Sequence, residues 1–181
     1  MKTSALVAAL ASSVSAANYF SLIAVDSTTP IHLREITASG QSLWIGKPTG
    51  SYCPGNVKKM GGCPSGKNTN FAGGNGSLGM GTVVPGGQQV YIDRESGAVK
   101  YTQAHSADTD GGITGGWSLT PQEGEDWSLL KYKRGLVACP VGGNAYQVFA
   151  NIKSVDFSPA CIGPFYAIAS PEKKADAWQY T

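Results

Sequence analysis

Short apolar segments separated by turn residues recur along most of the chain. Residues 31–36 alternate apolar and polar side chains, with Ile31 and Leu33 on one face, which predicts a half-buried strand. Similar segments rich in β-branched and aromatic residues are 19–25, 43–45, 89–92, 98–102, 117–119, 129–132, 136–139, 146–150 and 165–169. Intervals of roughly 8–18 residues between such segments resemble those of sandwiches and barrels. The pattern predicts an all-β fold, a single compact β-sandwich or β-barrel.

The stretches between these segments are predicted as loops and turns. Residues 46–87 are rich in Gly, Pro, Asn and Ser, and we expect long Gly-rich loops there. Residues 93–97 form a turn sequence between two strand-like segments, which predicts a hairpin. A second loop is expected at 107–116.

The first residues have the pattern of a secretory signal. Met1 and Lys2 give a positive start, residues 5–11 are all apolar, and small residues precede a cleavage point after Ala16. We therefore predict a signal peptide at 1–16, a β-rich domain at 17–181 and a secreted, extracellular protein. No later segment reaches the roughly 18 apolar residues of a membrane span, so no membrane partner is expected.

Composition narrows the class further. The chain has 181 residues, of which 24 are Gly and 10 are Pro, and only 14% are charged, which argues against a helix bundle. A hydrophobic content of 41% argues against disorder. The formal net charge of +2 is too small to indicate nucleic-acid binding, so no nucleic-acid partner is expected.

The four cysteines, Cys53, Cys63, Cys139 and Cys161, form an even set in a chain predicted to be secreted. Disulfides are therefore expected. Three pairings are possible, and we favour Cys53–Cys63 with Cys139–Cys161 because each pair closes a local loop. The spacings do not match a zinc site, and paired thiols leave none for catalysis.

Few residues suggest chemistry. His32 and His105 are the only histidines, and we expect neither to be catalytic. Asp108 and Asp110 follow His105, but the downstream Glu of a calcium-binding loop is missing. No catalytic residue, metal site or cofactor is predicted.

An acidic cluster and several aromatic residues are compatible with sugar binding. Glu123, Glu125 and Asp126 lie beside Trp127, and paired carboxylates would suit a glycoside hydrolase, although we expect a solvated loop. Flat aromatic rings suit sugar surfaces. We predict possible carbohydrate contacts at three aromatic residues, namely Trp44, Trp127 and Tyr132.

One N-glycosylation sequon is present, Asn75-Gly76-Ser77, in a Gly-rich loop of a chain predicted to be secreted. It predicts a glycan on Asn75.

An ordered series of short motifs runs from Tyr91 to Cys161. Its members are Tyr-Ile-Asp-Arg at 91–94, Gly97, Tyr101, Gly-Trp-Ser at 116–118, Leu-Val-Ala-Cys-Pro at 136–140 and Tyr-Gln-Val at 146–148. The series resembles the phialide-type fungal cell-wall proteins, the PhiA-like or IgE-binding family. It is also distantly similar to the C-terminal domain of Pir wall proteins, although the Gln-containing repeats of those proteins are missing here.

The resemblance implies a secreted, non-catalytic protein of the fungal cell wall, involved in wall organisation and asexual spore (phialide and conidium) development. Wall polysaccharide or wall proteins would be its partners, and its retention in the wall would be non-covalent or transient. Related secreted proteins are allergens or elicitors of plant defence. Two alternatives therefore stay open, an elicitor that acts on a host plant receptor and a carbohydrate-binding module for wall glucan.

Overall fold

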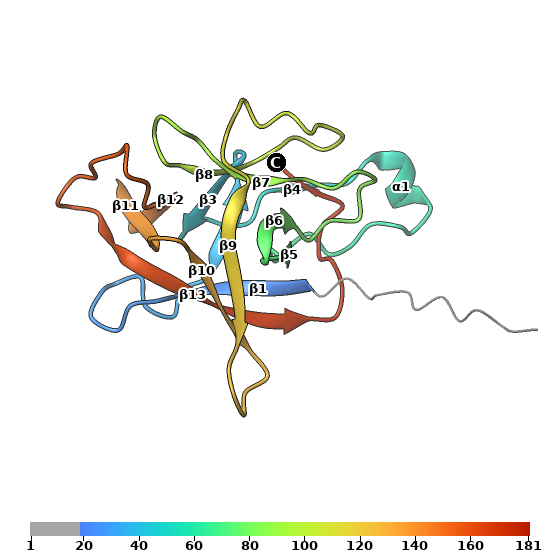
Figure 1. Ribbon diagram of the computed structural model, residues 1–181. Coiled ribbons are helices and arrows are strands. Elements are labelled where there is room, and N and C mark those ends of the chain that lie inside the picture. Colours follow the sequence, from blue (N-terminus) through green and yellow to red (C-terminus); the bar gives the residue numbers. More distant parts are fainter. Residues whose placement is uncertain (1–18) are drawn as a thin grey trace, which may run out of the picture.

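The structure is a computed structural model that describes residues 19–181, so the predicted signal peptide at 1–16 lies outside the described residues. Six strands form a closed antiparallel barrel: β1 (Tyr19–Val25), β5 (Phe71–Gly73), β6 (Gly76–Met80), β9 (Gly115–Pro121), β10 (Ser128–Tyr132) and β13 (Ile162–Glu172). They follow one another in that order, and pairing of β1 with β13 closes the ring (Figure 1). The all-β prediction is confirmed, and the architecture is a barrel with outer strands.

Apolar side chains fill the barrel, because inward-facing and outward-facing residues alternate along a strand. In β1, Phe20, Leu22 and Ala24 are buried, and the residues between them are partly exposed. The other barrel strands contribute Phe71, Leu78, Met80, Trp117, Leu130, Tyr132, Phe165, Ala167 and Ala169 to the same core. Two aromatic contacts mark it, a stacked pair of Phe20 and Phe71 at 6.2 Å and an edge-on pair of Trp117 and Tyr132 at 5.3 Å.

A second group of strands extends from the barrel. It consists of β2 (Ile36–Ser39), β3 (Ser42–Ile45), β7 (Val90–Ile92), β8 (Val99–Tyr101), β11 (Leu136–Gly142) and β12 (Ala145–Ala150). The first residues of β13 pair with β11 instead of a barrel strand. The sheet then continues through β12, β3, β8 and β7, and β2 pairs with β3.

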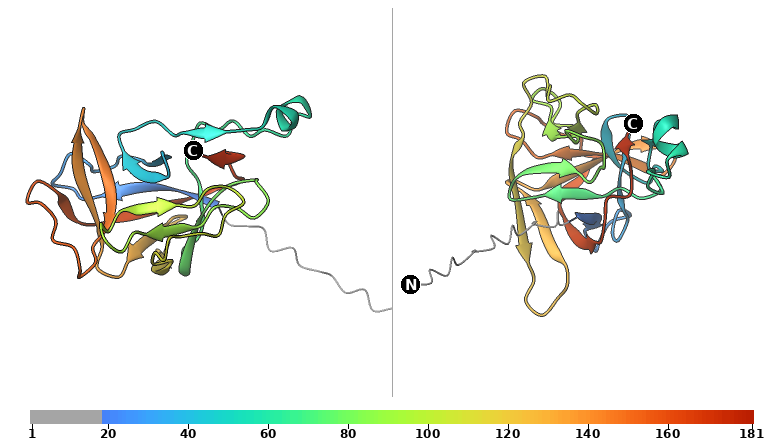
Figure 2. Two further views of the ribbon diagram at one scale, coloured as in Figure 1. Left: turned by 90° about the horizontal axis from the view of Figure 1, so that it is seen from above. Right: turned by 90° about the vertical axis from the view of Figure 1, so that its right-hand side faces the viewer.

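A small third sheet lies near the C-terminal end of the chain. It pairs β4 (Ser51–Tyr52) with β14 (Gln179–Tyr180), and the short helix α1 (Gly55–Lys59) follows β4. Figure 2 shows the α1 segment projecting from one end of the molecule. Within residues 19–181, no helix has the length and apolar character needed to span a membrane.

The structure contains the two disulfides favoured from the sequence. Cys53 bonds to Cys63 across α1, with their Cα atoms 6.0 Å apart. Cys139 of β11 bonds to Cys161, which directly precedes β13, with their Cα atoms 4.2 Å apart. Among the described residues, no cysteine is free.

The predicted hairpin at 93–97 joins β7 to β8, as expected. The Asp93 carboxylate accepts hydrogen bonds from the backbone N–H groups of Ser96 (2.9 Å) and Glu95 (3.1 Å). These bonds hold the pKa of the Asp93 carboxyl below its ordinary value, and the bond from the Ser96 N–H has the largest effect. Gly97 closes the turn with φ of +75°, a conformation that suits glycine.

The strand expected at 31–36 is wrong for most of its length. Residues 27–33 form consecutive turns, in which the N–H of His32 donates to the carbonyl of Thr29, and regular pairing begins only at Ile36. Leu33 has φ of +57° and is 63% exposed, although Ile31 is buried. The alternating apolar and polar residues of this segment therefore lie mostly in turns and not in a strand.

The long loop expected at 46–87 is also wrong in part, because it contains barrel strands β5 and β6. Glycine allows close approach of the backbones here. A Cβ at Gly81 would lie 2.8 Å from the Cβ of Asn70, and the N–H of Gly81 donates to the Asn70 carbonyl. A segment poor in strand-forming side chains therefore pairs through its backbone.

Candidate functional site

Four separate parts of the chain line a surface groove, which we call the amide groove. They are the turn between β2 and β3, the loop that precedes β7, the loop that follows β8, and the end of β14. One hollow of about 320 Å³ is lined by Gly40, Gln41, Gln103, Ala104, His105, Gln179, Tyr180 and Thr181. A second hollow of about 640 Å³ is lined by Pro85, Gly86, Gln89, His105, Ser106, Ala107, Thr109 and Thr114. His105 lines both hollows, so they adjoin at this residue, and we treat them together as the groove.

Two buried tyrosines support the first hollow. The Tyr101 and Tyr180 rings meet edge-on with their centroids 6.5 Å apart. The Tyr101 hydroxyl accepts from the N–H of Gln41 (3.2 Å) and donates to the main-chain oxygen of Thr181 (3.1 Å). Burial raises the pKa of both tyrosines well above the ordinary value, so both hydroxyls stay neutral. The hydroxyl of Tyr101 thereby joins two walls of the groove.

Buried Gln88 fixes the third wall. Its amide Nε2 donates to the carbonyls of Thr102 (2.8 Å) and Tyr180 (3.0 Å), and its Oε1 accepts from the N–H of Tyr180 (2.7 Å). A buried amide with its donors and acceptor used in this way is a structural residue. Gln88 therefore holds β14 against the end of β8.

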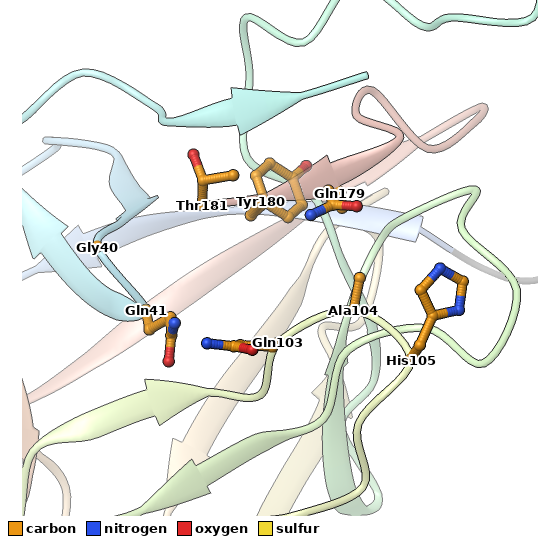
Figure 3. A pocket seen from close by; sticks show the side chains of 8 residues that line it. All are labelled: Gly40, Gln41, Gln103, Ala104, His105, Gln179, Tyr180 and Thr181. Carbon is orange, nitrogen blue, oxygen red and sulfur yellow. The ribbon is translucent and has the colours of Figure 1, made fainter. Parts of the chain in front are cut away.

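Three other glutamines, Gln41, Gln103 and Gln179, point their amides at the groove. Figure 3 shows Gln41 and Gln103 toward one end of the first hollow, His105 toward the other and Gln179 between them. None of these three amides makes a hydrogen bond to another residue of the described chain, although the backbones of Gln41 and Gln103 are bonded. Each amide offers one acceptor oxygen and two donor hydrogens to a ligand.

The predicted aromatic contacts do not line this groove. Tyr132 is a correction, because only 4% of it is exposed and its ring packs against Trp117 inside the barrel, where no polymer can reach it. Trp44 is partly buried, its Nε1 donates to the carbonyl of Ser39 (2.6 Å), and the Lys47 ammonium lies 3.1 Å from the ring centroid. One face of the Trp44 ring is thus covered.

Trp127 lies in the hairpin between β9 and β10, together with the acidic cluster. Its Nε1 donates to the carboxylate of Glu125 (3.1 Å). Glu123, Glu125 and Asp126 are exposed, as expected of a solvated loop. Figure 1 shows this hairpin on the opposite side of the molecule from the C-terminal end, where Thr181 lines the groove. A sugar contact at Trp127 stays a prediction.

The two histidines have different places. His32 is partly buried in the turn that follows β1, where its Nδ1 accepts from the N–H of Asp26 (3.3 Å). His105 is exposed, with φ of +62°, at the junction of the two hollows.

The Asp108 carboxylate accepts a hydrogen bond from the N–H of Asp110 (2.9 Å) within its own loop. Across residues 19–181, no group of three potential ligands is placed to hold a metal ion.

The sequon begins in the tight turn between β5 and β6, where Asn75 lies, and its Gly76 and Ser77 are the first residues of β6. Asn75 is exposed, and its Oδ1 accepts from the N–H of Leu119 (3.1 Å). The nitrogen Nδ2, the atom to which a glycan is attached, stays on the surface without a partner in the described chain. Glycosylation therefore stays a prediction that the geometry permits.

The groove glutamines were missed in the sequence. Gln41, Gln103 and Gln179 are far apart along the chain and form no motif. Glutamine in a turn is also common on any protein surface. The only local signal is that Gln41 and Gln103 each lie beside a predicted strand end.

These features define a class, a disulfide-bonded β-barrel protein with a polar surface groove. A family model described as PhiA-like secreted protein matches residues 20–181. A curated relative from the fungus Arthroderma benhamiae, named only as an uncharacterized secreted protein, is 37% identical over 155 residues, which cover 80% of this chain and 76% of that protein. No solved structure matches the chain. The protein belongs to the PhiA-like secreted protein family, as the ordered motifs predicted, whereas the similarity to Pir proteins stays a prediction.

Proposed function

We propose that this protein is a non-catalytic component of the fungal cell wall that takes part in wall organisation and in asexual spore development. The observation that carries the proposal is the lining of the amide groove in a chain that belongs to a secreted family. Unpaired amides and hydroxyls suit the hydroxyl-rich polymers that a secreted fungal protein meets outside the cell.

Binding without catalysis is supported by where the carboxylates lie. The acidic cluster at Glu123, Glu125 and Asp126 is in the β9–β10 hairpin and does not line the groove. A glycoside hydrolase needs two carboxyl groups that flank the scissile bond. Among the described residues, no Asp or Glu side chain lines the groove.

Wall fractionation tests this proposal. An epitope tag is best inserted directly after the predicted signal peptide, because a tag following Thr181 would obstruct the groove. In a sporulating filamentous fungus, we expect the tagged protein in the wall fraction and its release by hot detergent, since retention is non-covalent. Deletion of its gene should lower the number of conidia.

A secreted protein of similar size that does not bind the wall serves as the control. Recovery of the tagged protein only from the culture medium, with conidia unchanged by the deletion, would contradict the proposal. If the purified protein then caused cell death in infiltrated leaves, the host-directed alternative would replace it.

A further inference from the structure

The three groove amides come from rigid supports, although their side chains are free. The Gln41 backbone is held on both sides by Tyr101, whose hydroxyl accepts from the Gln41 N–H and whose N–H donates to the Gln41 carbonyl (3.2 Å). Gln179 directly precedes Tyr180, which Gln88 fixes through two bonds. The backbone on which these side chains stand is therefore in place before a ligand arrives, and only the side chains lose freedom on binding.

The groove also selects by charge. Apart from His105, its lining side chains are amides, hydroxyls, small residues and one proline. Within residues 19–181, the side chains of Lys and Arg, which bind acidic polymers, line neither hollow, and neither do the side chains of Asp and Glu, which would bind cationic polymers. A neutral ligand with many hydroxyl groups fits this lining.

The shape favours a chain over a compact solute. Two hollows of about 320 and 640 Å³ meet at His105, and both are open to solvent along the surface. Small residues form much of the rim, and a Cβ added at Gly40 or Gly86 would meet no atom within 4 Å. A polymer can therefore lie along the surface and enter one hollow after the other.

We infer that the amide groove binds a strand of neutral wall polysaccharide, with Gln41, Gln103 and Gln179 hydrogen-bonding to its sugar hydroxyls. This inference deepens the proposed function and rests on it for the source of the polymer. The sequence predicted sugar contacts at aromatic residues, whereas this inference assigns them to amides that the fold brings together.

Calorimetric titration with defined hexasaccharides tests the inference. The probes are laminarihexaose for β-1,3-glucan, chitohexaose for chitin, and polygalacturonate as an acidic polymer. We expect one or both neutral hexasaccharides to bind and polygalacturonate not to bind. The double variant Gln41→Ala/Gln103→Ala should weaken binding at least about tenfold, because two hydrogen-bonding side chains are lost.

Two further variants complete the design. Gln147→Ala removes a partly exposed glutamine of β12 outside the groove and should bind as the wild type does. Ala104→Trp places a large ring in the first hollow and should abolish binding. Circular dichroism checks that each variant is folded. If Ala104→Trp does not fold, the double variant Gln41→Ala/Gln103→Ala alone tests the groove.

Three results would overturn the inference: no binding of either neutral hexasaccharide at millimolar concentration, unchanged affinity in the folded groove variants, or tighter binding of polygalacturonate. Wall fractionation of the same variants distinguishes failure of the groove inference from failure of the proposed wall function. A wild type and a double variant that are equally wall-bound would refute the groove and leave the wall role intact. A wild-type protein that binds hexasaccharide but is never found in the wall would refute the proposed wall role and leave the groove inference intact.

Discussion

Inside the barrel the large side chains pack against other parts of the protein, whereas the three amides of the groove make no hydrogen bond within the described chain. Two glutamines near the groove show the same difference between a buried group with partners and a free one. Gln88 is 4% exposed and makes three hydrogen bonds, while Gln103 is exposed and its amide makes none. If the groove binds its proposed ligand, stability and recognition reside in different residues, and substitutions should separate them.

Truncation of a barrel side chain should have the largest effect. Phe71 is fully buried and stacks on Phe20, so Phe71→Ala should lower the free energy of unfolding by about 3–5 kcal/mol. Urea denaturation measures the change. Gln103→Ala is the matched control and should alter stability by less than about 0.5 kcal/mol. A loss below about 1 kcal/mol in Phe71→Ala would mean that the barrel is not the stable unit.

Removal of the disulfides should come next. The bridged cysteines are 10 residues apart in Cys53–Cys63 and 22 apart in Cys139–Cys161. Loop-closure entropy then gives about 2.7 and about 3.4 kcal/mol, so the double Cys→Ala variant of the second pair should be the less stable. Urea denaturation of both variants provides the test. The reverse order would show that the α1 loop stabilises the fold beyond its closure entropy.

Tyr101 joins two walls of the groove, and its loss should have an intermediate effect. Tyr101→Phe removes the bonds to Gln41 and Thr181 and should cost about 1–3 kcal/mol at neutral pH. Because burial raises the pKa of Tyr101 in the folded state, its contribution is complete below the unfolded pKa of about 10 and is lost as the pH rises above that value.

Stability measured from pH 8 to 11 checks this sign. The wild type should lose stability above pH 10 more steeply than Tyr101→Phe does. Parallel curves for the two proteins would indicate that the Tyr101 hydroxyl is accessible and ionises without unfolding.

The smallest expected change in stability is at the sequon. Protein secreted from a yeast host should carry a glycan on Asn75 that endoglycosidase removes, and Ser77→Ala should lack it, as intact mass will show. Stability of that variant should stay within about 0.5 kcal/mol, because Ser77 is exposed and the Asn75 bond to Leu119 uses Oδ1 and not Nδ2. Unmodified Asn75 in the wild type would refute the assignment.

Much of the fold could be predicted from the sequence, because a strand with one buried face carries β-branched and aromatic residues that can be recognised in the sequence. The segment 19–25 is a strand as predicted, and most later strands lie where β-branched and aromatic residues cluster. β5 and β6 could not be predicted, because Gly73 and Gly79 carry no side chain whose pattern could be recognised. Segment 31–36 misled because alternation in a turn looks the same as alternation in a strand.

The groove could not be predicted, for a topological reason. Gln41, Gln103 and Gln179 come together only because β3 pairs with β8 and Gln88 fixes β14 beside them. No spacing in a sequence encodes such pairings between distant segments. The disulfides could be favoured in advance because their partners are close in sequence.

Chemical-shift mapping with laminarihexaose and chitohexaose tests the central claim most directly, because it reports where on the surface the sugar binds. The account predicts that backbone amides near Gln41, Gln103–His105 and Gln179–Thr181 shift on titration, while those of the β9–β10 hairpin around Trp127 do not. Shifts confined to the hairpin, with the groove residues unmoved, would contradict it.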